Sequence, residues 1–588
     1  MDNLKNHIFV FFAICLIGFL SYSNSFEAAF QFDDEGFIIN NNYLHDVTSL
    51  KGLKQIYSHH RPSRFVGFVS LAIDYHFYHE NVFGYHITNF IVHILNGFFV
   101  WWFVMQVLSL KKFQESPLNK AKNLIAFFAA LIFVSHPLQT QAVTYIYQRA
   151  ASLASFFYLV SVNFYLKGRR NQKNNGSFVW FFVVAGISAV LGMLTKETLF
   201  TLPFIIILFE TGFLDDSDKD KKGLSKKVIT LFLIITPLIL FIPATFGFDL
   251  SKVFTPLVLR ANEHEIVTSG KYFLSQCRVI PQYIRLLFIP LGQNLDYDLP
   301  LAHSLWDAGV LPGMIFILSL IGAAFFLMKR NKFMALGLFW FFITLSVEAS
   351  FIPIRYLIFE HRLYLPMAGF SCVIAAGLFY ILKDYKKYVT AMIIIVVILS
   401  TLTYLRNEVW RTKVGFWEDV VSKSPNKCYV HFALGGAYYE QGAKKKALVH
   451  YNKALNLYNH EQKIIDKELL AKIYNNVALI FMDSYQDDEA FAALKKSIDY
   501  YPEYGPSWNN LGILNLTLGN HEETVRCLKK SIACQGEYAD AWYFMGKALL
   551  GMQEDGKARE SLLKARKLYL KSGNQKYLKE IDQIFQEL

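Results

Sequence analysis

The chain has 588 residues and a formal net charge of +12; 53% of its residues are hydrophobic, 16% aromatic and 18% charged. Charged residues make up about 25% of an ordinary soluble domain, so the composition excludes a wholly soluble protein and indicates a membrane protein with a soluble part appended. The positive charge does not indicate a nucleic-acid partner, because much of the excess lies in short loops between apolar segments.

Apolar segments recur from the N-terminus to about residue 405. Several of them are shorter than the roughly 20 residues that a perpendicular helix needs to cross a bilayer. We expect an all-α fold, a polytopic membrane helix bundle of about eleven spans. The expected spans are 7–24, 87–108, 121–135, 150–166, 178–194, 199–212, 228–246, 308–328, 333–353, 365–382 and 388–405.

Basic residues alternate between the two sides of these spans. They gather in the loops within 111–122, 167–173, 219–227, 329–332 and 383–387, whereas the other short loops hold only Arg149, Lys196, Arg355 and Arg362. By the positive-inside tendency the first set is cytoplasmic. The sequence therefore predicts a cytoplasmic N-terminus, two large outer loops at 25–86 and 247–307 within a membrane domain of residues 1–406, and a C-terminal domain outside.

From about residue 415 the hydropathy drops and a 34-residue period begins. Tyr474, Trp508 and Trp542 share one slot of the period, and Ala478, Gly512 and Gly546 share another. This period is typical of tetratricopeptide repeats, in which stacked helix pairs share one core. We expect a linker with a partial repeat at 407–427, and then an α-solenoid over 428–588 with units 428–461, 471–504, 505–538 and 539–572 and a final helix. Such a solenoid binds a protein or peptide, or serves only as a scaffold.

Three consecutive acids, Asp33, Asp34 and Glu35, follow the first span. Carboxylates at a membrane surface are costly unless they are solvated, paired or used. Adjacent acids raise one another's pKa, which suits a proton acceptor near neutral pH. The alternative interpretation is a helix N-cap, where Asp is favoured.

A polar stripe marks the second span, because His86, Asn89 and His93 have the spacing i, i+3 and i+7 of one helix face. Polar groups on one face of a span usually point into the bundle. They contact a polar substrate or bond another helix, and the sequence leaves both possibilities open.

Further polar residues lie at the outer ends of the spans: Arg61, Arg64, Arg149, Lys196, Glu197, Glu360, Arg362 and Tyr364. Cations in this position can hold a lipid phosphate. They can also snorkel, or pair with carboxylates, as Lys196 would with Glu197. Asp296 and Asp298 form the acidic pair of the second outer loop, and we expect no divalent metal there.

Several motifs occur in a specific order: Asp33-Asp34, Arg61-Pro62, Gly84-Tyr85-His86 with Asn89 and His93, His136-Pro137 with Arg149, Lys196-Glu197, QCRVIPQYIRLLFIPLGQNLDYD from 276 to 298, and EHRLYLP from 360 to 366. The repeats come after them. Over nearly its whole length the chain resembles the transmembrane and tetratricopeptide repeat-containing family, in a shorter, bacterial form. That family is similar in architecture to protein O-mannosyltransferases of the glycosyltransferase C superfamily.

The resemblance implies an inverting integral-membrane glycosyltransferase. Its donor would be a polyprenyl-phosphate sugar, typically of mannose, and its acceptors would be Ser or Thr of extracytoplasmic proteins docked on the repeats. One of Asp33, Asp34 and Glu35 would deprotonate the acceptor hydroxyl; the related enzymes have an Asp-Glu pair, and the extra Asp here leaves the identity of the base open. The implied location is the bacterial inner membrane, in contact with its lipids and with the repeats in the periplasm.

The resemblance also implies how the leaving phosphate is held. Fixed cations stabilise an anionic leaving group without a metal or other cofactor, and the candidates are Arg362, Arg149 and Lys196, in that order. His86 and His93 would contact phosphate or sugar. Two alternative functions are a non-enzymatic, membrane-anchored repeat scaffold, and a transferase or ligase acting on glycan or lipid acceptors.

Overall fold

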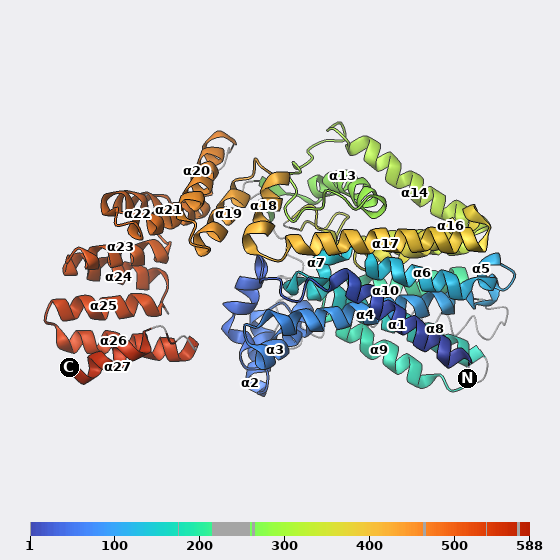
Figure 1. The fold of residues 1–588 in the computed structure, drawn as a ribbon, viewed down its shortest axis with the longest axis horizontal. Coiled ribbons are helices and arrows are strands. Elements are labelled where there is room, and N and C mark those ends of the chain that lie inside the picture. Colours follow the sequence, from blue (N-terminus) through green and yellow to red (C-terminus); the bar gives the residue numbers. More distant parts are fainter. Residues whose placement is uncertain are drawn as a thin grey trace. The chain divides into compact units, whose positions relative to one another are not determined.

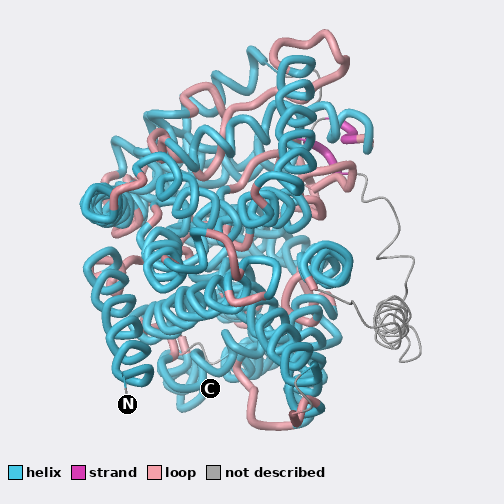
Figure 2. The backbone as a smooth tube through the Cα atoms, turned by 90° about the vertical axis from the view of Figure 1, so that its right-hand side faces the viewer, coloured by secondary structure: helices cyan, strands magenta, loops and turns pink. Residues whose placement is uncertain are grey.

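The computed structural model describes residues 2–173, 176–214, 259–261, 265–354, 356–461, 466–536, 538–572, 575 and 577–587. The chain divides into two compact units, Met1–Phe416 and Trp417–Leu588, which Figure 1 colours from blue to yellow and from orange to red. The described residues are helical apart from loops and one short antiparallel pair, β1 (Leu259–Ala261) and β2 (Glu265–Val267), with Leu259 opposite Val267 (Figure 2). The expectation of a predominantly α-helical fold is confirmed.

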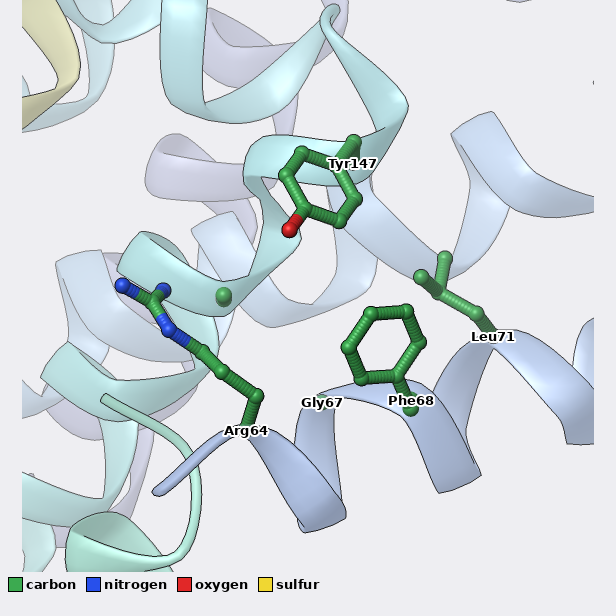
Figure 3. A pocket seen from close by; sticks show the side chains of 6 residues that line it. Arg64, Gly67, Phe68, Leu71 and Tyr147 are labelled. Atoms are coloured by element: carbon green, nitrogen blue, oxygen red, sulfur yellow. The ribbon is translucent and has the colours of Figure 1, made fainter. Parts of the chain in front are cut away.

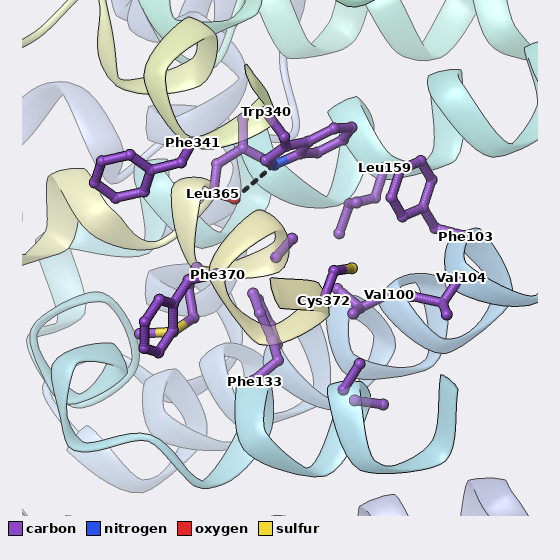
Figure 4. Close-up of a cluster of buried hydrophobic side chains, with 14 of the residues drawn as sticks. Val100, Phe103, Val104, Phe133, Leu159, Trp340, Phe341, Leu365, Phe370 and Cys372 are labelled. Carbon is purple, nitrogen blue, oxygen red and sulfur yellow. Dashed lines mark hydrogen bonds between the residues drawn. The ribbon is translucent and has the colours of Figure 1, made fainter. Parts of the chain in front are cut away.

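The first unit contains α1 (Asp2–Tyr22), α2 (Leu50–His59), α3 (Phe65–Tyr78), α4 (Val82–Leu108), α5 (Pro117–Lys120), α6 (Lys122–Ser135), α7 (Thr140–Val143), α8 (Arg149–Lys173), α9 (Val179–Met193), α10 (Leu202–Leu208), α13 (Ser269–Phe288), α14 (Val310–Arg330), α15 (Lys332–Leu345), α16 (Pro366–Leu382) and α17 (Tyr385–Val409). Helix α18 (Lys413–Lys423) crosses the division between the units. The core of the first unit forms where α4 packs on α6 and α8, and α16 packs on α6 and α15. In this core the Trp340 Nε1 donates to the Leu365 carbonyl at 3.0 Å, beside Phe103 and Leu159 (Figure 4).

Among the residues that the structure describes, three helices, α4, α14 and α17, are long and apolar enough to cross a membrane, and a fourth span results if α6 and the bent segment Pro137–Val143 count as one. Four apolar segments in the same part of the chain are shorter: His7–Tyr22, Val179–Met193, Lys332–Leu345 and Pro366–Leu382. The expected number of eleven spans is therefore not confirmed. The expected span 228–246 and the first part of the loop 247–307 lie outside the described residues.

Helix α6 ends at Ser135 because a proline follows two residues later. The residue before a proline is disfavoured in the helical conformation, and His136 is extended, with φ −78° and ψ 130°. The chain bends by 52° here and continues through short helical turns to Arg149. This connection, residues 136–148, contacts the loop that follows α1.

The second unit is a row of helix pairs: α19 (Cys428–Glu440) with α20 (Lys444–Glu461), α21 (Lys467–Met482) with α22 (Asp487–Tyr500), α23 (Gly505–Thr517) with α24 (His521–Cys534), and α25 (Ala539–Gly551) with α26 (Asp555–Ser572), followed by α27 (Leu578–Glu587). The slot shared by Gly512 and Gly546 lies where paired helices touch. A Cβ atom would lie 2.8 Å from the Leu528 side chain at Gly512, and 2.6 Å from that of Leu562 at Gly546.

Candidate functional site

The loop that follows α1, the expected first outer loop, is held against the 136–148 connection by Asp34. Its Oδ2 accepts the backbone N–H of Gln31 at 2.9 Å, and its Oδ1 accepts that of Tyr147 at 2.7 Å. The side chain is 1% exposed. Burial raises the pKa of Asp34 to about 8, an effect to which the neighbouring Asp33 charge adds and which the backbone hydrogen bonds oppose. Both carboxylate oxygens are thus engaged in holding the loop.

Asp33, by contrast, is half-buried. Its backbone N–H donates to the Tyr145 hydroxyl at 3.1 Å. Four charged residues surround the Tyr147 hydroxyl. Its pKa is raised to about 12, mainly by burial; the Arg64 and Arg61 charges oppose this rise, and the Asp33 and Glu197 charges add to it. Asp33 therefore lies within electrostatic reach of the same tyrosine as Arg64.

A small cavity lies under this cluster, lined by Arg64, Gly67, Phe68, Leu71, Tyr147 and Ala150. Figure 3 shows the Arg64 guanidinium and the Tyr147 hydroxyl on one side of it and the Phe68 ring below. Its volume is about 10 Å³, roughly the space of one water molecule. In this conformation the cavity has room for a water and not for a sugar.

Two ion pairs order the cations around the cluster. The Arg64 guanidinium lies 2.9 Å from Glu197, whose other oxygen accepts the Ser63 hydroxyl at 2.7 Å. Lys196 lies 2.8 Å from Glu348, and both side chains are nearly inaccessible.

The expected alternative pairing of Lys196 with Glu197 is wrong. Lys196 has an extended backbone, with φ −161° and ψ 149°. Successive side chains of an extended chain point to opposite sides, so the two neighbours reach different partners.

Arg362 is 2% exposed and is held by neutral oxygens. Its guanidinium donates to the carbonyls of Leu357 at 3.0 Å and Tyr356 at 2.6 Å. Longer contacts reach the Tyr272 hydroxyl at 3.3 Å and the Glu348 carbonyl at 3.5 Å. Among the described residues no carboxylate lies within ion-pair distance of Arg362; the Glu348 charge acts on it from farther away.

The charges of the cluster also act on the neighbouring His361. Burial lowers the pKa of His361, and the charges of Lys196, Arg362 and Arg64 lower it further. The structure thus brings Lys196, Glu197 and Arg362 together with Arg64, and we call this group the loop cluster. Arg64 is not one of the three cations expected at the leaving phosphate.

Arg149 faces a different set of partners. It forms an ion pair with Asp74 at 2.5 Å, donates to the carbonyls of Ser70 at 3.1 Å and Tyr85 at 3.0 Å, and also donates to Asn89. The side chain is 1% exposed. These contacts tie the start of α8 to α3 and α4 and engage the guanidinium on several sides.

The polar stripe of α4 bonds neighbouring segments. His86 donates to the Ala28 carbonyl at 2.9 Å, Asn89 to that of Val143 at 2.9 Å, and His93 to that of Val134 at 3.0 Å. The second ring nitrogen of His93 accepts the Tyr364 hydroxyl at 2.7 Å. Of the two possibilities left open for this stripe, these contacts favour the bonding of helices.

The remaining candidates lie around this cluster. Buried Glu360 accepts from the Tyr297 hydroxyl at 2.6 Å and the Asn294 N–H at 2.8 Å, which orders the segment carrying Asp296 and Asp298. Glu35 forms an ion pair with Lys413, and Arg61 is exposed to solvent.

Asp74 and Glu348 were missed in the sequence. Each is a lone acid in an otherwise apolar stretch, and such a residue usually has a partner or a function. That signal could have identified both. Tyr147 carries no comparable signal, because aromatic residues are frequent throughout the first unit.

The described chain is mainly helical, with apolar segments, a polar cluster beside the loop that follows α1 and an appended row of helix pairs. This architecture is that of a membrane protein with a helical-repeat extension. Its similarity to curated proteins covers about three quarters of the chain. A protein O-mannosyl-transferase of Caenorhabditis elegans is 26% identical over 459 residues, which are 75% of this chain and 61% of the relative. Protein O-mannosyl-transferase TMTC1 of Homo sapiens is 23% identical (75% and 54%), and TMTC4 of Mus musculus is 25% identical (75% and 66%).

The resemblance to the transmembrane and tetratricopeptide repeat-containing family is thereby confirmed, while the chain spans less than two thirds of the length of these relatives. No family model matches the chain. Among solved structures, MamA is 20% identical with a TM-score of 0.23, covering 28% of this chain and 84% of that protein. The repeat protein YrrB is 17% identical with a TM-score of 0.23, covering 31% and 89%. Scores this low add nothing to the description of the fold.

Proposed function

We propose that this protein is an integral-membrane, inverting glycosyltransferase that moves mannose from a polyprenyl-phosphate carrier to Ser or Thr of extracytoplasmic proteins. The observation that carries the proposal is the placement of Asp33 and the cations Arg64, Lys196 and Arg362 around one loop cluster. The similarity to protein O-mannosyl-transferases over three quarters of the chain supports it. An acid and a group of cations are the two elements that this chemistry needs.

In the proposed reaction the acceptor hydroxyl oxygen attacks the anomeric carbon of the sugar. The bond from that carbon to the phosphate oxygen breaks, and the lipid phosphate leaves with its electron pair. The hydroxyl proton passes to a carboxylate. Attack opposite the leaving group inverts the anomeric carbon, and no metal or other cofactor enters the proposed step.

We assign the proton acceptor to Asp33 and give Asp34 a positioning role. Asp34 is 1% exposed and uses both oxygens to bind backbone amides, so it cannot reach an acceptor while the loop is folded. Asp33 is half-buried and lies near Tyr147 and Arg64. Glu35 is engaged with Lys413 and is the weakest of the three candidates.

The leaving phosphate is assigned to Arg362, Lys196 and Arg64. Arg362 is positively charged and donates to neutral oxygens, and charge-assisted bonds to phosphate are strong. Arg149 is removed from this set because its partners lie on α3 and α4 and it is not among the cations whose charges act on His361. The His86–Asn89–His93 stripe and Tyr364 are assigned to holding the bundle together.

The proposal includes the eleven-span topology of a glycosyltransferase C bundle in a bacterial inner membrane, with a cytoplasmic N-terminus and periplasmic repeats that bind the acceptor. Supporting it are the alternation of basic loops and the helix pairs of the second unit.

The test is sugar transfer by the purified full-length chain, with a synthetic polyprenyl-phosphate mannose as donor and a Ser/Thr peptide as acceptor. Asp33→Asn should lower the transfer rate by at least about a hundredfold, the usual contribution of a general base. The matched control is Glu80→Gln, which removes one exposed carboxylate from the same outer loop and should retain the wild-type rate.

Three outcomes would overturn parts of the proposal. Wild-type transfer by Asp33→Asn removes the assigned base. Transfer to a glycan or lipid, with none to the peptide, identifies the enzyme as one acting on other acceptors. The scaffold alternative would be favoured if the chain showed no transfer while substitutions on the repeat surface abolished its function in cells.

A further inference from the structure

A groove of about 460 Å³ lies between α13 and α14, on the side of α13 that faces away from the loop cluster. It is lined by Arg278, Pro281, Gln282, Arg285, Gly309, Pro312, Gly313 and Phe316. Arg278 and Arg285 are seven residues apart on one helix, so they lie on the same face of α13. The groove thus presents two cations beside the first two turns of α14.

Among the described residues, neither arginine has an acidic partner. Arg285 donates to the Gln282 side chain at 3.0 Å and to the Leu291 carbonyl at 3.2 Å, while Arg278 donates to the Pro300 carbonyl. In the part of the chain that the structure describes, no carboxylate lies within ion-pair distance of either, and the Arg278 Nε is buried without a hydrogen-bond partner. Two neighbouring cations without a counter-charge favour an anionic ligand.

The surroundings of the groove are apolar and exposed. Only 17% of the apolar stretch of α14 is buried inside the protein, and Phe316, which lines the groove, is 39% exposed. Exposed apolar surface continuous with a pair of cations matches a molecule with an anionic head and hydrocarbon chains. A small soluble anion would leave that apolar surface uncovered.

We propose that this groove binds the phosphate of an anionic bilayer phospholipid, with the acyl chains lying along α14. The opposite face of α13 explains what such a lipid would do. Tyr272 donates to the Glu348 carbonyl at 2.7 Å, and Tyr283 donates to the Phe359 carbonyl at 3.0 Å. A lipid that secures α13 also stabilises the loop that carries Arg362. The lipid site itself does not depend on the proposed transferase activity.

The test uses the full-length chain in detergent with added phosphatidylglycerol or phosphatidylcholine, read by native mass spectrometry and by thermal unfolding. Wild type should bind phosphatidylglycerol preferentially and unfold at a higher temperature in its presence. Arg278→Gln/Arg285→Gln should lower that affinity by roughly tenfold or more. Lys329→Gln/Arg330→Gln removes the same charge from exposed positions at the other end of α14 and should retain the preference for phosphatidylglycerol. Arg278→Lys/Arg285→Lys keeps the two charges in the groove and should retain most of that preference.

Equal loss in the two glutamine double variants would overturn the proposal, because the effect would then follow net charge alone. Stabilisation by inorganic phosphate equal to that by phosphatidylglycerol would identify a site for a free anion. Displacement of phosphatidylglycerol by an equimolar amount of polyprenyl phosphate would reassign the groove to the sugar carrier. Failure of the transfer assay alone would leave these binding results unchanged, so the two proposals fail separately.

Discussion

Lys196 and Glu348 form a buried ion pair, with Nζ 2.8 Å from Oε1 and side chains 3% and 9% exposed. The lysine directly precedes the short helical segment Glu197–Thr201, and the acid follows α15, so this one ion pair joins two connections between helices. The pair adjoins Arg362, which donates to the Glu348 carbonyl.

Removing one member of this pair should destabilise the protein more than removing both. Lys196→Ala leaves a buried carboxylate without its partner, and such changes cost about 3–5 kcal/mol. The double variant Lys196→Met/Glu348→Leu replaces the pair by apolar side chains and should recover most of that loss. Thermal unfolding in one detergent measures both. A double variant as unstable as the single one would show that the ion pair itself stabilises this region, and that the unpaired carboxylate is not the cause of the loss.

Stability should fall as the pH rises from about 4 to about 8, through Asp34. Its folded pKa is about 8 and its ordinary value is 3.8, so in this window the folded state binds a proton that the unfolded state has lost. The contribution is fully present below pH 4 and declines by up to about 1.4 kcal/mol per pH unit. Between pH 5 and 8 the melting temperature of Asp34→Asn should depend less on pH than that of the wild type. Parallel curves for the two proteins would mean that Asp34 is ionised throughout.

Arg149 should prove to be structural and not a donor contact. Arg149→Lys keeps the charge but loses the branched set of bonds to Asp74, Asn89 and two carbonyls, and we expect a loss of about 1.5–3 kcal/mol of stability. The remaining folded enzyme should retain the wild-type KM for the lipid donor. A raised KM for the donor with an unchanged melting temperature would show that Arg149 binds the donor phosphate.

Two glycines of the last repeat pair offer a matched comparison. A Cβ atom at Gly546 would lie 2.6 Å from Leu562 Cγ, whereas at Gly556 it meets nothing within 4 Å. Gly546→Ala should destabilise α25 and α26 by about 1–3 kcal/mol through overpacking. Gly556→Ala should be neutral or stabilise by up to about 1 kcal/mol. Hydrogen exchange of the amides in these two helices measures the difference, and equal exchange in both variants would contradict the close helix contact at Gly546.

Local patterns in the sequence were sufficient for the helical class and for the resemblance. Apolar runs and the 34-residue period depend on residues near each other in the chain, and packing at slots such as Gly512 and Gly546 follows from that period. The span count is not confirmed because apolar composition does not fix the length of a helix. Among the described residues, four of the apolar helices are too short to qualify as spans by themselves.

The sequence by itself determined the kinds of residue near the outer loops: three acids after the first span, and a set of cations at later span ends. Tertiary structure alone decided their partners. In the folded chain, Arg149 pairs with Asp74 and Lys196 pairs with Glu348. The buried Asp34 accepts hydrogen bonds from two backbone amides, and Arg362 donates to carbonyl oxygens. The physical reason is that the environment of a buried charge is set by which side chains reach within a few ångströms, and residues distant in the chain make those contacts only when the helices pack.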